Sequence, residues 1–279
     1  MKRRHAPLLV ALLAAAAFAV DIDVGGTRLS IPAPPGYTTL GDAQPYAGML
    51  RSFVPPQNEQ YAVFLTAGDV ETAARGEVPE PSRFFYVQTA KSVVHRTATL
   101  EDFEALKTGV QKQNARLAEA IEKEIPGLIN RVNEQVRKDH AVDLGLSMNQ
   151  VVPLPPHDES DRTLAFSMLT SYEMTDAEGN AVSWDASVTA TFVHVKGKVV
   201  FLYAVGERAD LAWSREASRE WAAAVVAANP STGAIAERER QRSKRGFDWG
   251  RVGVYAIVGA VIGGVIGLAR LLAGGRKKG

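Results

Sequence analysis

Histidine is the side chain best suited to acid–base or metal chemistry near neutral pH. The chain has five, which are His5, His95, His140, His157 and His194. No two are four residues apart, as two metal ligands on one helix face would be. The chain has no cysteine, which excludes thiolate metal sites, cysteine nucleophiles and disulfide bonds. We therefore expect neither a metal ion nor a cofactor.

Residues 157–161 form the most suggestive cluster of reactive types. His157, Asp158, Glu159 and Asp161 offer nitrogen and oxygen atoms to a divalent cation or to a hydrolytic reaction. Prolines precede the cluster, so a solvated acidic loop is the simpler interpretation. A hydrolase that uses this loop stays open as an alternative function.

A second combination is His194 with Asp185 and Ser187, which invites comparison with a catalytic triad. The chain lacks the Gly-x-Ser-x-Gly pattern of a nucleophile elbow around this serine, so we interpret His194 as an ordinary strand residue. Gly25 and Gly26 indicate a turn, and no Walker or dinucleotide fingerprint is present. The sequence therefore predicts no catalytic residue.

The elements that would carry these residues follow from hydrophobic periodicity. Alternating runs predict a hairpin around the two glycines and several further strands, at residues 20–24, 27–31, 59–66, 83–94, 163–174, 182–195 and 199–205. Short connections between the last three strands indicate antiparallel neighbours. Helices are expected over 45–53 and 211–228, the second capped by Asp210.

One apolar stripe runs over residues 99–139 and predicts a long amphipathic helix capped by Thr99. Pro126 and Gly127 predict a kink or two helices in series. The helix could lie against the sheet of its own chain, or form a coiled-coil-like arm that meets a partner. The sequence leaves both interpretations open.

Both termini indicate a membrane. A basic start and an apolar run over 6–18 predict a signal peptide over 1–19, with a mature chain beginning at Val20. Residues 252–273 are expected to form a transmembrane helix, because residues 252–269 carry no charge and would span roughly 27 Å as a helix. The candidates for the membrane interface are Trp249, Arg251, Arg270, Arg276, Lys277 and Lys278. Gly259, Gly263 and Gly267 recur every four residues, which is typical of helix association, although composition alone also explains them.

The expected organisation is thus a signal peptide, a domain over 20–230, a basic linker over 231–251, the span, and a cytoplasmic basic tail over 274–279. The fold class is α+β, with a largely antiparallel sheet, the long amphipathic helical segment and a C-terminal helix before the span. A formal net charge of +1 gives no electrostatic footprint for nucleic acid.

The order of elements resembles the PsbP-like superfamily of extracytoplasmic α/β/α sandwich domains. Two stretches carry the resemblance, namely residues 29–37 at the start and residues 197–204 leading into 213–229 at the end. The long helical segment over 99–139 departs from a minimal domain of that kind. The resemblance implies a binding or accessory domain, and it transfers no catalytic residue.

These observations predict a single-pass protein of the inner membrane, with its main domain in the periplasm or outside the cell. We expect it to bind or scaffold another envelope component without catalysis, in contact with membrane lipid. Besides the hydrolase, the alternative is a structural oligomer that assembles through the glycine face of the span.

Overall fold

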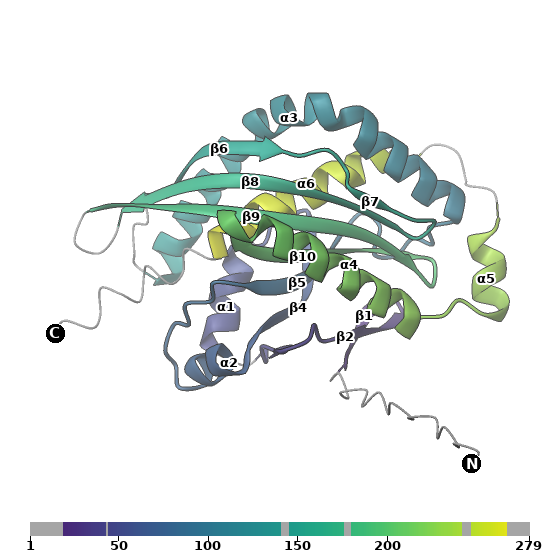
Figure 1. Cartoon of the computed structure of the whole chain (residues 1–279), viewed down its shortest axis with the longest axis horizontal. Helices are drawn as coiled ribbons and strands as arrows, with labels where there is room; N and C mark the ends of the chain where they lie inside the picture. The colour runs from purple at the N-terminus through teal and green to yellow at the C-terminus, as the bar shows by residue number, and fades with distance from the viewer. Residues whose placement is uncertain (1–18, 43, 141–144, 176–179, 242–246, 267–279) are drawn as a thin grey trace, which may run out of the picture.

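The computed structural model describes residues 19–42, 44–140, 145–175, 180–241 and 247–266 (Figure 1). In this part of the chain the main sheet has eight strands, in the order β3-β4-β5-β10-β9-β8-β6 with β7 beside β8. The strands are β3 (Tyr37–Thr39), β4 (Asn58–Thr66), β5 (Phe84–Ala90), β6 (Ser147–Pro153), β7 (Asp158–Glu159), β8 (Thr163–Thr175), β9 (Ala181–Val195) and β10 (Lys198–Glu207). Each neighbouring pair is antiparallel, which confirms the predicted α+β class.

Two tight turns form where the sequence predicts them. The separate hairpin of β1 (Ala19–Val24) and β2 (Thr27–Pro32) turns at Gly25 and Gly26, whose φ angles are +57° and +81°. A two-residue hairpin with both φ angles positive matches the right-handed twist of its strands, and glycine adopts that conformation at little cost. The turn between β9 and β10 uses Lys196 and Gly197 in the same way, at φ +48° and +73°.

Helices cover both faces of the sheet. The β1–β2 hairpin and α4 (Leu211–Ala228) lie on one face, and α1 (Pro45–Ser52), α3 (Leu100–His140) and α6 (Trp249–Ile266) lie on the other (Figure 1). Strand alternation sets this division, because Phe85 and Val87 point into the α4 layer while Phe84 and Tyr86 point toward α6. The remaining elements are α2 (Ala67–Ala74), the short 3-10 turn η1 (Arg208–Asp210) and α5 (Gly233–Glu239).

The long helix α3 packs on its own chain at its N-terminal end. Phe103, Leu106 and Val110 are buried in the core beside α6. This is the first of the two interpretations that the stripe allowed. The helix α3 continues through Pro126 as one helix, and does not divide into two helices in series. The predicted cap is confirmed, since Thr99 Oγ1 accepts a hydrogen bond from the Asp102 amide at 3.1 Å.

The expected transmembrane helix is not found. Among the described residues, no helix is both long enough and apolar enough to cross a membrane. Residues 249–266 of the expected segment and its flank form α6, which packs between the sheet and α3. Within residues 249–261, the buried side chains are Trp249, Val252, Ala256, Ile257, Val258, Ala260 and Val261. A helix that is apolar all round is buried either in lipid or in protein, so its composition alone could not distinguish the two.

Other expectations at the termini meet the structure only in part. The predicted signal peptide over 1–19 lies outside the described residues except for Ala19, which begins β1. Gly267, Arg270 and the predicted tail over 274–279 also lie outside them. The segment interpreted as a basic linker contains α5, and its Glu239 side chain is buried. Asp210 stands before α4 without capping it, because its carboxylate accepts hydrogen bonds from Arg83 at 2.5 Å and from the Glu207 amide at 3.1 Å.

Candidate functional site

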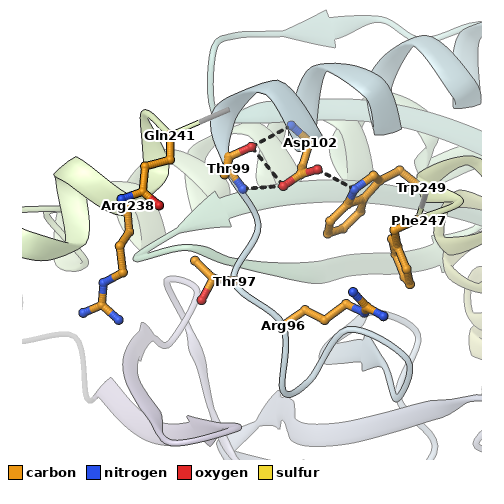
Figure 2. A pocket seen from close by; sticks show the side chains of 8 residues that line it. All are labelled: Arg96, Thr97, Thr99, Asp102, Arg238, Gln241, Phe247 and Trp249. Carbon is orange, nitrogen blue, oxygen red and sulfur yellow. Dashed lines mark hydrogen bonds between the residues drawn. The ribbon is translucent and has the colours of Figure 1, made fainter. Parts of the chain in front are cut away.

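A basic pocket opens at the end of the sheet where the β9–β10 turn, the loop before α3, α5 and the start of α6 meet. Its volume is about 360 Å³ (Figure 2). The lining residues are Arg96, Thr97, Thr99, Asp102, Arg238, Gln241, Phe247 and Trp249. They come from two regions far apart in the sequence, residues 96–102 and 238–249, so the chain must fold before the pocket exists.

Buried polar contacts hold the loop that carries Arg96 and Thr97. Lys198 is 5% exposed, and its Nζ donates to the carbonyl oxygens of Val94 at 2.8 Å and Arg96 at 3.1 Å. Burial lowers the pKa of Lys198, because desolvation disfavours the charged form. The Ala98 amide donates to the Gly197 carbonyl at 2.8 Å. A buried cation is costly unless it is paired or hydrogen-bonded, and these two hydrogen bonds fix one wall of the pocket.

His194 holds the same loop in place through a hydrogen bond to its backbone. Its ring is fully buried, and Nε2 lies 2.9 Å from the Ala98 carbonyl oxygen, which can only accept. The proton is therefore on Nε2, and Nδ1 is free to accept from Arg162 Nη1 at 3.3 Å. Burial lowers the pKa of His194, which agrees with a neutral ring. The histidine thus positions the loop and does not face the pocket.

Glu239 fixes α5, the helix that presents Arg238. Its carboxylate is 1% exposed and accepts from Arg162 Nη2 at 2.9 Å, the Gly197 amide at 2.7 Å and Ser231 Oγ at 2.8 Å. Burial alone would raise the pKa of Glu239, but these three hydrogen bonds stabilise the carboxylate and hold the pKa below its ordinary value. The loop and α5 are therefore both anchored to the β9–β10 turn by buried charged groups.

Asp102 joins the starts of α3 and α6 at the back of the pocket. Its Oδ2 accepts from the amide of Thr99 at 2.8 Å and from the hydroxyl of Thr99 at 2.9 Å, and its Oδ1 accepts from Trp249 Nε1 at 2.7 Å (Figure 2). The carboxylate is 5% exposed, so both oxygens are engaged and turned away from solvent. The Asp102 carboxylate therefore ties the start of α3 to the start of α6.

Two arginines supply the charge that faces the pocket. Figure 2 shows Arg96 and Arg238 on either side of Thr97. The Arg96 guanidinium lies 4.2 Å from the centre of the Phe247 ring, and Arg238 Nε donates to the Ala234 carbonyl at 3.2 Å. Within the described part of the chain, neither has a carboxylate within 4 Å. Their remaining N–H groups can therefore bind an anion, and guanidinium matches phosphate or carboxylate in two-point geometry.

A second hollow of about 330 Å³ adjoins the pocket. It shares Thr97 and Arg238 with the first and is lined also by Gly26, Thr27, Arg28, Lys196, Gly197 and Ile235. Lys196 adds a further cation and is half-buried in the β9–β10 turn. Arg28 is partly neutralised, because its guanidinium pairs with Asp21 at 2.5 Å.

The acidic segment over 157–161 lies elsewhere, and it is not a loop throughout, because Asp158 and Glu159 form the short strand β7 beside β8. Glu159 pairs with Lys107 Nζ at 3.0 Å and accepts from Gln111 Nε2 at 2.9 Å. Burial and the charge of Arg215 lower the pKa of His157. Where the structure describes the chain, no three His, Asp or Glu side chains are grouped so that they could hold a metal ion.

The triad suggested by sequence does not assemble. Ser187 and His194 are seven residues apart on β9, roughly 23 Å at 3.3 Å per residue, and their side chains point to opposite faces of the sheet. Ser187 Oγ donates to the Glu207 carbonyl at 2.9 Å, and Asp185 accepts from Ser171 Oγ at 2.6 Å. The interpretation of His194 as a strand residue is correct, although its anchoring contact was not foreseen.

The glycine face of α6 approaches the sheet of the same chain. The Gly259 carbonyl accepts from Tyr86 Oη at 3.0 Å, and a Cβ added at Gly259 would lie 2.6 Å from Tyr203 Oη. Gly263 lies within α6, and Gly267 falls outside the described residues. Of the expected interface residues, Trp249 is buried on Asp102, and Arg251 is exposed.

Sequence reasoning missed the basic pocket. Arg238 was interpreted only as part of a basic linker, and Arg96 and Thr97 carry no motif. The sequence signal that exists is the two-residue turn at Lys196 and Gly197, which predicts a tight hairpin but not its neighbours.

No family model matches this chain, and no curated protein matches its sequence. In structure it is similar to the Ran-binding protein Mog1p of Saccharomyces cerevisiae, with 10% identity and a TM-score of 0.27, over 77% of this chain and 93% of that one. A point mutant of Mog1 matches with 10% identity and a TM-score of 0.28, over 76% and 93%. Mog1 has the Mog1/PsbP-like fold, the family that the sequence resembled. At these TM-scores the likeness transfers no partner, ligand or activity to this chain.

Proposed function

We propose that this protein is an exported, non-catalytic binding protein that recognises an anionic group of a ligand or envelope component through the basic pocket. The observation that carries the proposal is the pair Arg96 and Arg238, which line one cavity and have no carboxylate within 4 Å in the described part of the chain. Cationic clefts of this kind concentrate anions and add charge-assisted hydrogen bonds.

The rigidity of the pocket walls supports binding as the role. Lys198, His194 and Glu239 are buried charged or polar groups whose hydrogen bonds hold the loop and α5 on the turn. Walls that are ordered before a ligand arrives reduce the conformational entropy that binding would cost. Asp102 is the one carboxylate in the lining, and its oxygens already accept hydrogen bonds from Thr99 and Trp249. The other polar side chains of the lining besides the Trp249 indole are arginine, threonine and glutamine, which can hold a ligand but are not general bases.

Export is the second part of the proposal, and it rests on the basic and apolar residues at the start of the sequence. Cell fractionation and sequencing of the mature N-terminus test it. The expected result is an extracytoplasmic protein that begins at Val20. Finding the chain in the cytosolic fraction with its first residue still present would contradict export. The proposal about the pocket would not be affected.

Isothermal titration of the purified full chain with inorganic phosphate, citrate and a hexaglutamate peptide tests the binding role. We expect saturable binding of at least one anion, and its loss in the double variant Arg96→Gln/Arg238→Gln. The matched control is Arg137→Gln/Arg208→Gln, which removes the same charge from two exposed arginines outside the pocket. Equal binding by the wild type and the pocket variant would refute the proposal.

A further inference from the structure

We infer that the ligand is a polyanion with at least two phosphate-type groups, one in each of the two hollows that meet at Thr97 and Arg238. The inference rests on the proposed function and specifies the ligand of the same site. Its basis is that the two hollows are neighbours on the surface and share these two lining residues, so that one ligand can reach both; we call the pair the basic depression.

Positive charge is present in both parts of this depression. The first hollow has Arg96, the second has Lys196 and the partly neutralised Arg28, and Arg238 belongs to both. Among the lining residues the single carboxylate is that of Asp102, whose oxygens are committed to Thr99 and Trp249. A ligand with one anionic group would therefore leave the cations of one hollow without a counter-charge.

The chemistry of the lining favours phosphate over carboxylate. A phosphate group carries up to two negative charges and three acceptor oxygens, whereas a carboxylate carries one charge and two oxygens. The donors available are guanidinium and ammonium groups with the hydroxyls of Thr97 and Thr27. Hollows of about 360 and 330 Å³ are each within the range of small-ligand sites, and each is roomy enough for one such group.

A titration series in which the number of phosphate groups changes tests the inference. Inorganic phosphate, pyrophosphate and tripolyphosphate are titrated into the full chain at constant ionic strength, because polyanion affinity depends on salt. We expect tripolyphosphate to bind at least tenfold more tightly than phosphate. We also expect Arg96→Gln and Lys196→Gln each to weaken tripolyphosphate binding by about tenfold, the usual effect of losing one charge-assisted hydrogen bond.

The single-group ligand provides the internal comparison. Phosphate occupies one hollow at a time, so only one of Arg96→Gln and Lys196→Gln should weaken it strongly. The control Arg208→Gln removes one exposed charge outside both hollows and should leave all three affinities within about twofold, the scale of a long-range charge effect in salt.

The outcomes separate this inference from the proposed function. The two-group ligand is refuted if Lys196→Gln leaves the tripolyphosphate affinity unchanged, or if tripolyphosphate binds no more tightly than phosphate. Either result is still compatible with the proposed anion-binding site. Tighter binding of hexaglutamate than of tripolyphosphate overturns the phosphate assignment alone. If no anion binds, both proposals fail.

The phosphate groups could belong to a soluble phosphorylated compound or to anionic lipid headgroups. Co-sedimentation with vesicles of 30% phosphatidylglycerol in phosphatidylcholine, against pure phosphatidylcholine, distinguishes the two sources. Binding to the anionic vesicles that tripolyphosphate displaces and Arg238→Gln abolishes supports the lipid source. Binding of tripolyphosphate that these vesicles do not compete with supports the soluble one.

Discussion

Gly259→Ala tests whether α6 is docked on the sheet. In the docked helix the new Cβ would lie 2.6 Å from Tyr203 Oη and 2.7 Å from both Asn58 Nδ2 and Gln88 Oε1. These atoms cannot withdraw freely, because Tyr203 Oη donates to the Ala256 carbonyl at 2.8 Å and Asn58 Nδ2 to Gln88 at 2.9 Å. Something in this buried set must therefore shift, and overpacking of this kind costs about 1–3 kcal/mol.

Two further effects decide whether Gly259→Ala stabilises or destabilises the folded protein. Disturbing one of the buried hydrogen bonds adds about 1 kcal/mol of destabilisation. Alanine gains about 1 kcal/mol over glycine from helix propensity. The net expectation is a loss of about 1–3 kcal/mol in the free energy of unfolding. At a urea m-value of about 2 kcal/mol/M, the unfolding midpoint falls by roughly 0.5–1.5 M.

The control is Gly48→Ala in α1, where a Cβ would have no heavy atom within 4 Å. Alanine is preferred over glycine in a helix there too, and the new Cβ meets no clash. We therefore expect Gly48→Ala to stabilise the protein by about 0.5–1 kcal/mol. Urea unfolding followed by tryptophan fluorescence measures both variants. A helix that is free of the sheet would respond to Gly259→Ala as α1 responds to Gly48→Ala. Stabilisation by Gly259→Ala would therefore refute the docked position of α6.

Three further predictions concern the same packing and the pocket walls. In a chain without other cysteines, Val110→Cys/Gly253→Cys should form a disulfide on oxidation, since the Cβ positions are 4.0 Å apart. The disulfide should raise the free energy of unfolding under non-reducing conditions by about 2–4 kcal/mol, and free thiols found by mass spectrometry after oxidation would contradict the prediction. A chain ending at residue 230 should lose cooperative unfolding, because the core-facing side of α6 is missing; a sharp transition like that of the full chain would show α6 to be dispensable. Burial lowers the folded-state pKa of His194 below its unfolded value, so its contribution is full above about pH 6.5 and is lost as the pH falls through the folded pKa. His194→Gln keeps a donor for the Ala98 carbonyl and should flatten the loss of stability between pH 7 and pH 5; parallel pH profiles would argue against this role.

Local patterns predicted most of the strands and the helices with strong periodicity. The hairpin at Gly25 and Gly26 and the turn at Lys196 and Gly197 formed as expected, because φ preferences act within two residues. The edge strand β6 and the short helices α2 and α5 were missed. They have weak or brief patterns, and their stability comes from packing on neighbours.

The sequence by itself determined the α+β class, the antiparallel pairing of the last three long strands and the start of α3 at Thr99, because these depend on residues close in the chain. Only the tertiary structure decided what surrounds the apolar segment that became α6, since a uniformly apolar helix satisfies lipid and protein interior equally well. The tertiary structure also made the pocket, because Arg96 and Arg238 are 142 positions apart and meet only through buried contacts to the β9–β10 turn. Such long-range convergence leaves no periodic or spaced trace in the sequence.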